Sequence, residues 1–333
     1  MVNRKNAAVV GYGAIGPIHA AAITKSDFSR LYAVCDTDPN AKKRAESEHA
    51  EHGTRIFSSY DELLRDKSVD SVHICTPHFL HAEMLVKAHD AGKHIVVEKP
   101  AVMLAAEAES VRRVFSDGRV RCCAVLQNRL NPCVREMKRI IDGGEYGEVI
   151  GAKGAVTWLR DKAYYESGEW RGRRATEGGG AVINQALHTL DLLRYLCGDF
   201  VSVKSHCSNR GLKGVIEVED TAEAFMLTES GARVLFYATN SYAVSAPVEV
   251  EVQLERAVLK YTYSRLFLIC DGELRELAAD KKADGEKWYW GKCHETLINN
   301  FYSSLCGAER EYPPLEEGLK TAETVFEIYK ENE

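Results

Sequence analysis

The chain has 333 residues, of which 45% are hydrophobic and 28% charged, with a formal net charge of −6 and a pI near 6.0. This composition is typical of a soluble globular protein, excludes disordered and collagen-like chains, and at this length predicts about two domains. No apolar run approaches the roughly 18 residues of a membrane-spanning helix, and mild acidity gives no general attraction to nucleic acid or anionic lipid, so we expect neither partner.

The cysteines indicate a cytoplasmic protein with reduced thiols. There are ten, none forms a C-x-x-C pair, and several fall at the ends of apolar, strand-like runs. Cysteines in such positions behave as small buried residues, and a disulfide framework is not expected in a chain of this length. The polar stretch Met1–Asn6 is too short for a secretory signal.

The first part of the chain alternates strand-like and helix-like segments. Apolar runs predict strands at 7–10, 31–35, 56–57, 69–75, 94–97 and 121–126. Helical patterns lie between them, at 15–25, 41–50, 60–65, 79–91 and 105–115. Alternation with short links requires crossover connections, so we predict a doubly wound parallel sheet of the Rossmann type over residues 1–124.

The pattern changes after about Gln127. Helices are expected at 135–141, 181–196, 295–305 and 315–329, and a long alternating strand at 149–159. Residues 201–276 have the pattern of antiparallel strands, with turns at Ser230-Gly231 and Asp271-Gly272. We therefore expect residues 125–333 to form an α+β domain with a large, mainly antiparallel sheet.

A dinucleotide-binding motif follows the first predicted strand. The segment Gly11–Gly16 has the form G-x-G-x-x-G and opens the first predicted helix, whose N-terminus presents free N–H groups to a pyrophosphate. Asp36 follows Gly16 by 20 residues, which is the spacing of a ribose-binding carboxylate. A carboxylate there repels a 2′-phosphate, so NAD is favoured over NADP. The basic run at 42–44 could reach a phosphate, but we interpret it as a solvated helix face.

Two further segments carry candidate catalytic groups. Lys99, in Glu98-Lys99-Pro100, follows the fifth predicted strand, beside the ligand crevice of a doubly wound sheet. Three glycines at 178–180 lead into a helix that carries Asn184 and His188. A lysine and a histidine at a nicotinamide suit hydride transfer to or from a secondary alcohol. The alternative is a surface lysine and a helix histidine satisfied by hydrogen bonds.

These motifs resemble, in kind and in order, those of the Gfo/Idh/MocA oxidoreductases, the family of glucose–fructose oxidoreductase and inositol dehydrogenase. The resemblance covers most of the chain to about residue 200. The matching segments are Gly11–Gly16 with His19, Cys75-Thr76-Pro77 with His81, Glu98-Lys99-Pro100, Gln127-Asn128-Arg129, and 178–180 followed by Asn184, His188 and Asp191.

The resemblance implies an N-terminal NAD-binding domain and a C-terminal open-faced sheet domain for substrate binding and oligomerisation. It implies hydride exchange between nicotinamide and a sugar, sugar derivative or inositol, in a homodimer or homotetramer. The residues expected to bind the cofactor are Gly11, Gly13, Ala14, Ile15, Gly16, Asp36, Thr76, Pro77, His81, Glu98, Lys99 and Asn128.

The resemblance also assigns catalytic roles. Lys99 is the expected hydrogen-bond donor to the reacting oxygen and the nicotinamide ribose, and His188 the usual acid/base. Asn184 occupies a position that is often aspartate. An aspartate would favour the protonated forms of His188 and Lys99, whereas an amide can only hydrogen-bond. We therefore expect His188 or Lys99 to act as base while Asn184 orients the substrate.

Substrate contacts are expected from the loop before the three glycines. Trp170 and Tyr165 suit the apolar face of a sugar ring, while Arg171 and Arg129 could hold a carboxylate or phosphate. The alternative is a mobile, solvated loop anchored by one tryptophan. The aromatic run at 288–290 is interpreted as core or subunit interface. The five histidines between 73 and 94 match no metal-ligand spacing, so no metal is expected.

Two other functions stay open. One is a non-catalytic dinucleotide-binding sugar sensor, which would keep the fold and lose the chemistry. The other is an NAD-dependent glycosidase or epimerase that oxidises and re-reduces its substrate in one cycle. The retained Lys99 and His188 favour the dehydrogenase. The particular sugar or cyclitol, the carbon oxidised, the direction and any phosphate or acid group on the substrate are not encoded in these motifs.

Overall fold

The computed structural model describes residues 4–281 and 293–330. The chain divides into two compact units, the first formed by Met1–Val125 and His294–Lys320 and the second by Leu126–Cys293 and Thr321–Glu333. Residues 294–320 thus group with the first unit, whereas the sequence analysis assigned them to the second domain. The predicted aromatic segment Trp288-Tyr289-Trp290 lies outside the described residues. Among the described helices, none is long and apolar enough to cross a membrane.

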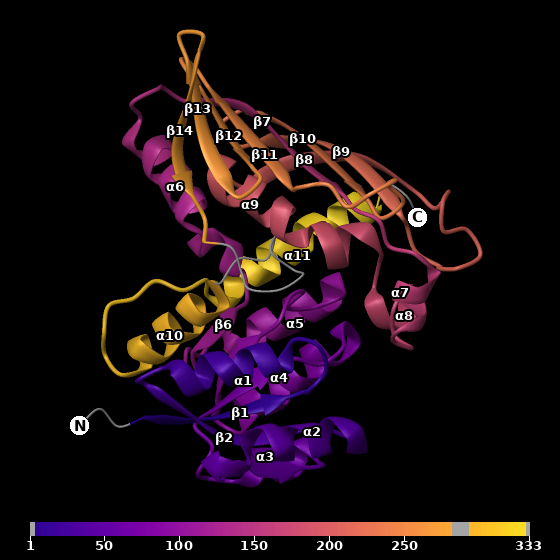
Figure 1. The fold of residues 1–333 in the computed structure, drawn as a ribbon, viewed down its shortest axis with the longest axis vertical. Helices are drawn as coiled ribbons and strands as arrows, with labels where there is room; N and C mark the ends of the chain where they lie inside the picture. Colours follow the sequence, from indigo (N-terminus) through magenta and orange to yellow (C-terminus); the bar gives the residue numbers. More distant parts are fainter. Residues whose placement is uncertain (1–3, 282–292, 331–333) are drawn as a thin grey trace. The chain divides into compact units, whose positions relative to one another are not determined.

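Unit 1 contains a six-stranded sheet in the order β3-β2-β1-β4-β5-β6, with every neighbouring pair parallel. Its strands are β1 Lys5–Val10, β2 Ser29–Cys35, β3 Arg55–Phe57, β4 Ser71–Ile74, β5 His94–Val97 and β6 Cys122–Ala124. Its helices are α1 Gly16–Lys25, α2 Pro39–His49, η1 Ala50–His52, α3 Tyr60–Arg65, η2 His78–Leu80, α4 His81–Asp90, α5 Ala105–Phe115 and α10 Cys293–Leu305. The predicted doubly wound parallel sheet is confirmed (Figure 1).

The central strands of unit 1 are short and buried on both faces. Every residue of β4 is buried, and Val96 and Val97 of β5 are fully inaccessible. Continuous apolar runs of this kind are typical of strands that helices cover on both sides. Because these strands are fixed, the turns at their carboxyl ends are fixed as well, and those turns carry the predicted cofactor site.

Unit 2 contains an eight-stranded sheet in the order β14-β13-β12-β11-β7-β10-β9-β8. Its strands are β7 Val149–Thr157, β8 Phe200–Ser208, β9 Thr221–Thr228, β10 Arg233–Thr239, β11 Glu249–Leu254, β12 Val258–Thr262, β13 Arg265–Cys270 and β14 Glu273–Ala279. The pair β7 and β10 is parallel and the other pairs are antiparallel, so the predicted mainly antiparallel sheet is confirmed. Asp271 and Gly272 both adopt positive φ at the predicted β13–β14 turn, which is the geometry of a tight hairpin.

One face of this sheet is covered by helices α6 Pro132–Gly143 and α9 Leu187–Cys197 (Figure 1). Side chains along β9 and β10 alternate between buried and exposed, so the other face carries exposed side chains. Several of those side chains are large and apolar, with exposed fractions of 42% for Phe225, 56% for Leu235 and 40% for Tyr237. The helix α11 Leu315–Lys330 completes the described chain.

The segment before the three glycines folds into two short helices, α7 Lys162–Glu166 and α8 Arg174–Glu177. Tyr165 is only 5% exposed, and it packs in a small apolar cluster with Leu212, Ile216 and Val218. Ser167, Glu169 and Arg173, between the two helices, are exposed, as in the alternative interpretation of a solvated loop. The buried anchor is Tyr165, whereas Trp170 is half-buried.

Candidate functional site

The glycine loop has the shape that a dinucleotide requires. Gly11 adopts φ 89°, and a Cβ atom there would lie 2.6 Å from the carbonyl oxygen of Cys75. A Cβ on Gly16 would collide with the carbonyl oxygen of Gly11, whereas a Cβ on Gly13 would meet nothing within 4 Å. The first and third glycines therefore pack the turn, and the second leaves an open approach at the N-terminus of α1. This geometry fits a pyrophosphate.

Asp36 is held at the same loop. Its Oδ2 accepts the backbone N–H of Tyr12 at 2.6 Å, and its Oδ1 accepts that of Asp38 at 2.8 Å. The carboxylate is thus fixed in place beside the first glycine turn while still half-buried, which suits a ribose hydroxyl donor.

Arg44 is exposed, as a solvated helix face requires, and it also contacts the glycine loop. Its guanidinium donates to the carbonyl oxygen of Gly13 at 3.0 Å and to that of Tyr12, and it lies 5.2 Å from the centre of the Tyr12 ring. Arg44 therefore supports the glycine loop. Lys42 points elsewhere and donates to the Ser58 hydroxyl at 2.7 Å.

His81 joins two turns of unit 1. Its Nδ1 lies 2.7 Å from the carbonyl oxygen of Pro100, and its Nε2 lies 2.8 Å from that of Thr76. The ring is fully buried. His81 therefore connects the Thr76-Pro77 turn to the segment that follows Lys99, and the peptide between Lys99 and Pro100 is cis.

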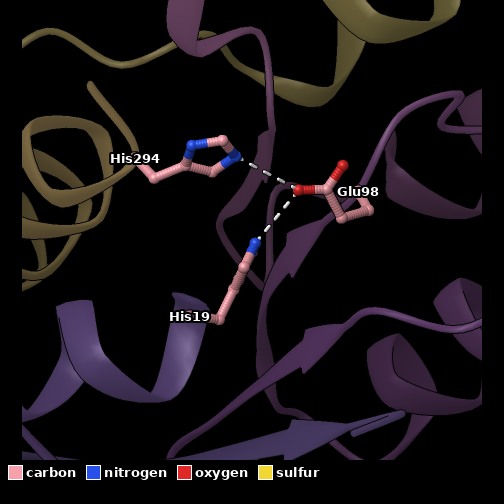
Figure 2. A group of neighbouring side chains, drawn as sticks. All are labelled: His19, Glu98 and His294. Atoms are coloured by element: carbon pink, nitrogen blue, oxygen red, sulfur yellow. Dashed lines mark hydrogen bonds and ion pairs between the residues drawn. The ribbon is translucent and has the colours of Figure 1, made fainter. Parts of the chain in front are cut away.

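Glu98 is the centre of a buried polar cluster in unit 1 (Figure 2). Its Oε1 lies 3.0 Å from His19 Nε2 and 3.6 Å from His294 Nε2. Its Oε2 accepts the backbone N–H of Lys99 at 3.1 Å. Burial disfavours the charged carboxylate, but the two histidines outweigh this effect and hold the pKa of Glu98 well below its ordinary value. Glu98 therefore remains ionised and fixes the backbone at Lys99.

The hydrogen bonds around His19 extend inward. His19 Nδ1 lies 2.8 Å from His73 Nδ1, whose Nε2 lies 2.7 Å from the Tyr302 hydroxyl, and that hydroxyl lies 2.7 Å from Ser71 Oγ. Burial lowers the pKa of both histidines, so both are neutral. With the His19 Nε2–H donating to Glu98, every donor in this series points toward that carboxylate.

The same cluster contains the one group of metal-ligand type found among the described residues. The ligand atoms of His19, Glu98 and His294 all lie within 4.8 Å of one another. These atoms could hold a divalent cation. The ordinary hydrogen bond between His19 and Glu98 explains the cluster without an ion, so we assign no metal to it.

The second candidate helix begins with an unusual turn. Residues Ala181–Ala186 form a π-helical segment (η4), and α9 begins at Leu187, whereas one continuous α-helix was predicted. π-helical turns place side chains at spacings that an α-helix does not allow, and they occur often at functional sites. Asn184 lies in this turn and His188 in the first turn of α9, and both are half-buried.

Glu177 is the residue that sequence reasoning missed. It ends α8 directly before the three glycines and is only 1% exposed. Its Oε1 accepts the side-chain N–H of Asn184 at 2.5 Å, and its Oε2 accepts the backbone N–H of Gly172. Burial raises the pKa of Glu177 to about 7 despite these two hydrogen bonds. The only signal for Glu177 in the sequence was its position, as a single acidic residue directly before the three glycines.

His188 has a polar neighbour in η3 Gln127–Leu130. Gln127 Nε2 lies 3.3 Å from His188 Nε2, so the amide N–H donates to that nitrogen when it carries a lone pair. Gln127 thus helps to hold the His188 ring in place. The neighbouring Asn128 is half-buried, and its Oδ1 has no hydrogen-bond partner within the described residues. This oxygen could therefore accept a hydrogen bond from a ligand.

Arg129 lies in a buried ion pair. Its guanidinium donates to both carboxylate oxygens of Asp191, at 2.9 and 2.6 Å, and Thr321 donates to the same carboxylate at 2.7 Å. This pair joins η3 to α9 within unit 2. The structure therefore gives Arg129 and Asp191 a packing role, and the substrate contact expected of Arg129 stays a prediction.

An aromatic and cationic cluster surrounds Tyr164. The guanidinium groups of Arg171 and Arg160 lie 4.5 and 5.2 Å from the centre of its ring, and Arg171 also lies 5.6 Å from that of Trp170. The Tyr164 hydroxyl accepts from Gln185, the residue after Asn184, at 2.7 Å. Tyr165, in contrast, is buried and hydrogen-bonded to Asn240 at 2.7 Å. Tyr164, which the sequence analysis did not include among the site residues, is therefore nearer the η4 turn.

Comparison with known proteins agrees with this description. The family pattern described as "Oxidoreductase family, NAD-binding Rossmann fold" matches residues 5–125, and the "GFO/IDH/MocA C-terminal domain" matches residues 134–260. The chain therefore belongs to the GFO/IDH/MocA oxidoreductase family, and its first unit is an NAD-binding Rossmann domain. The resemblance expected from the motifs is confirmed.

Individual relatives are named dehydrogenases. The chain is 34% identical over 209 residues to scyllo-inositol 2-dehydrogenase (NAD(+)) of Bacillus subtilis, covering 62% of this chain and 58% of that protein's length. It is 25% identical over 322 residues to levoglucosan dehydrogenase of Pseudarthrobacter phenanthrenivorans, covering 87% of this chain and 81% of that protein. The WlbA dehydrogenase of Bordetella pertussis, solved with NADH and UDP-GlcNAcA, superposes with a TM-score of 0.84 at 28% identity, covering 98% of this chain and 96% of that one.

Proposed function

We propose that this protein is an NAD(H)-dependent dehydrogenase or reductase that exchanges hydride between nicotinamide and a secondary hydroxyl or ketone of a sugar, sugar derivative or inositol. The observation that carries the proposal is that both acid/base-type side chains of the family motifs are present and positioned: Glu98 accepts the backbone N–H of Lys99 at 3.1 Å, and the Gln127 amide lies 3.3 Å from the His188 ring. A protein that only sensed a dinucleotide would need neither group.

Each site residue has a distinct role in the proposed reaction. NAD, when bound, supplies the hydride acceptor. Lys99 donates a hydrogen bond to the reacting oxygen and so stabilises negative charge as it develops there. His188 takes the hydroxyl proton in oxidation and returns it in reduction. Asn184 orients the substrate. Lys99 belongs to unit 1, while Asn184 and His188 belong to unit 2.

The proposed substrate is a ring-shaped polyol. The Tyr164 and Trp170 rings offer surfaces for the C–H face of such a ring, and the half-buried Arg171 could hold an acidic substituent. The named relatives support a panel that includes scyllo-inositol, levoglucosan and a UDP-linked uronic acid. Tyr165 packs edge to face against Tyr164 and supports this surface, while the expected contact between Arg129 and the substrate stays a prediction.

We also propose a cytoplasmic homodimer or homotetramer. Seven free cysteines are buried among the described residues and support a reducing compartment, namely Cys35, Cys75, Cys122, Cys123, Cys133, Cys197 and Cys293. The apolar side chains on the exposed face of the unit 2 sheet support self-association.

The test is the appearance or loss of NADH absorbance with NAD or NADP and a panel of inositols, aldoses, anhydrosugars, sugar acids and keto-sugars. Lys99→Ala and His188→Ala should each lower kcat/KM for the active compound by about 100- to 10,000-fold, the range for loss of a polarising or acid/base group. NAD binding without turnover on any compound would contradict the proposal and favour the sensor. Product without net NADH would favour the closed-cycle glycosidase or epimerase.

A further inference from the structure

Asn184 stands where related enzymes often carry aspartate, yet a carboxylate lies directly behind it. Glu177 Oε1 is 2.5 Å from the Asn184 amide nitrogen, and the carboxylate belongs to a separate helix, α8. Glu177 is nearly inaccessible, whereas Asn184 is half-buried. The pair therefore has an outer amide and an inner acid.

We propose that Glu177 is the positioning residue for Asn184. It provides, from behind Asn184, the carboxylate that an aspartate at position 184 would have provided. This inference rests on the proposed function and deepens it. An asparagine amide can be turned through a half-rotation, and the two orientations exchange its donor and its acceptor. An ionised carboxylate only accepts hydrogen bonds, so Glu177 selects the orientation with the NH2 group inward. The acceptor Oδ1 then lies on the opposite side of the amide, where a substrate hydroxyl can donate to it.

The backbone fixes the carboxylate in turn. Glu177 Oε2 accepts the N–H of Gly172. Gly172 adopts φ 68°, and a Cβ atom added there would collide with Ile216. Both carboxylate oxygens of Glu177 therefore accept a hydrogen bond, Oε1 from the Asn184 side chain and Oε2 from the Gly172 backbone. Replacement by glutamine would turn one acceptor into a donor, and that donor would face either Asn184 or Gly172.

Burial and the neighbouring charges place the pKa of Glu177 near neutral pH. Arg171 favours its charged form, and Glu219 opposes it; Tyr165 is the further titratable group that interacts with it. Burial is the largest effect, so the pKa lies near neutrality. Once protonated, Glu177 must donate one hydrogen bond, and the orientation of the Asn184 amide is no longer enforced. Activity should therefore fall as the pH falls through this titration.

The decisive experiment exchanges the two groups. Asn184→Asp alone places two carboxyl groups in direct contact, so they share a proton and kcat/KM falls at least about tenfold. Glu177→Gln alone loses one hydrogen bond and should lower kcat more than it raises KM. The double variant Asn184→Asp/Glu177→Gln restores one acid and one amide, and we expect kcat/KM at least about tenfold above that of Asn184→Asp.

The pH profile of kcat/KM supplies the readout that a merely structural role would not move. In Glu177→Gln the acid limb should lose the part that Glu177 contributes, so that only the limb of the base His188 remains. The matched control is Glu217→Gln, an exposed carboxylate that accepts the backbone N–H of Arg174 at 3.1 Å in the same segment; it should keep the wild-type profile. A double variant no better than Asn184→Asp, or an acid limb that is the same in Glu177→Gln as in the wild type, overturns the inference.

A failure of the proposed function is distinguishable from a failure of this inference. If the wild-type chain turns over no compound in the panel, the proposed function fails, and the same variants are compared by denaturant midpoint without substrate. Recovery of the midpoint in the double variant, relative to Asn184→Asp, then supports the Glu177–Asn184 coupling. Additive losses in midpoint overturn it.

Discussion

At the scale of single residues, Glu98 shows how this fold keeps a charge in its interior. Two histidines and one backbone N–H converge on a carboxylate that is 7% exposed. A buried charge is tolerated when it is fully hydrogen-bonded, and it becomes costly when one donor is removed. The Glu98-Lys99-Pro100 motif was evident from the sequence, but its histidine partners are far apart in the chain and have no common spacing.

We therefore predict that His19→Phe lowers the free energy of unfolding by about 2–3 kcal/mol, the cost of losing a hydrogen bond to a charged group. The pKa of Glu98 is depressed in the fold, so its stabilisation is present above the unfolded pKa and is lost as the pH falls through the folded pKa. Removing His19 raises the folded pKa, so acid unfolding should begin at a higher pH. Urea unfolding at a series of pH values measures this.

The control is His206→Gln, because His206 forms an exposed ion pair with Glu223 at 3.0 Å. An exposed pair contributes little, so that variant should unfold like the wild type. If both variants gave the same small change, the buried cluster would not be supporting Glu98.

At the scale of elements, the glycine loop was predictable because the reason for each glycine is local: Gly11 and Gly16 pack too closely for a Cβ, and Gly13 leaves the loop open. The Glu177–Asn184 contact was not, since it depends on the π-helical turn Ala181–Ala186 and on the short helix α8. Neither element has a recognisable hydrophobic period, because each is only about one turn long. The sequence motifs therefore pointed to Asn184 and His188 as candidate catalytic residues but not to the acid behind Asn184.

The loop geometry predicts opposite outcomes for two glycine substitutions. Gly13→Ala meets no atom within 4 Å, so it should keep the stability of the fold while weakening NAD binding by about tenfold or more. Gly16→Ala collides with the Gly11 carbonyl and should destabilise unit 1 by about 1–3 kcal/mol. NAD titration followed by protein fluorescence, together with thermal unfolding, separates the two effects. Equal loss of stability in both variants would contradict the assigned roles.

The exposed apolar face of the unit 2 sheet predicts that a single charged substitution there weakens self-association. Leu235 lies on β10 and is 56% exposed, so Leu235→Glu should leave the fold intact and shift the protein toward monomers. Light scattering after size-exclusion chromatography measures the mass. The control is Leu104→Glu, at a leucine of unit 1 that is 53% exposed. A wild-type protein that is already monomeric would refute the proposed association.

At the scale of the whole molecule, unit 1 needs a segment from the end of the chain. Helix α10 contributes four fully buried side chains to it, namely Leu297, Ile298, Phe301 and Tyr302. The helix itself was predicted, since its apolar residues repeat with the helical period. Its membership of unit 1 was not, because periodicity identifies a buried face without identifying what covers that face.

We predict that residues 1–125 alone do not fold cooperatively, because the surface that α10 covers would be left exposed. The same residues joined to 294–320 through a short Gly/Ser linker should unfold cooperatively and bind NAD. Circular dichroism during urea unfolding and NAD titration test the two chains. Cooperative unfolding of 1–125 with an unchanged midpoint would contradict this assignment.

The discontinuity of both units also determines when the protein can fold during its synthesis. A ribosome makes a chain from the N-terminus and releases about 5–20 residues per second, so an N-terminal domain often folds before the next is made. Here the first unit is complete only after residue 320, and the second requires residues beyond 321. The nascent Rossmann domain therefore stays incomplete until residue 320 has been made, and the surface that α10 covers stays exposed until then.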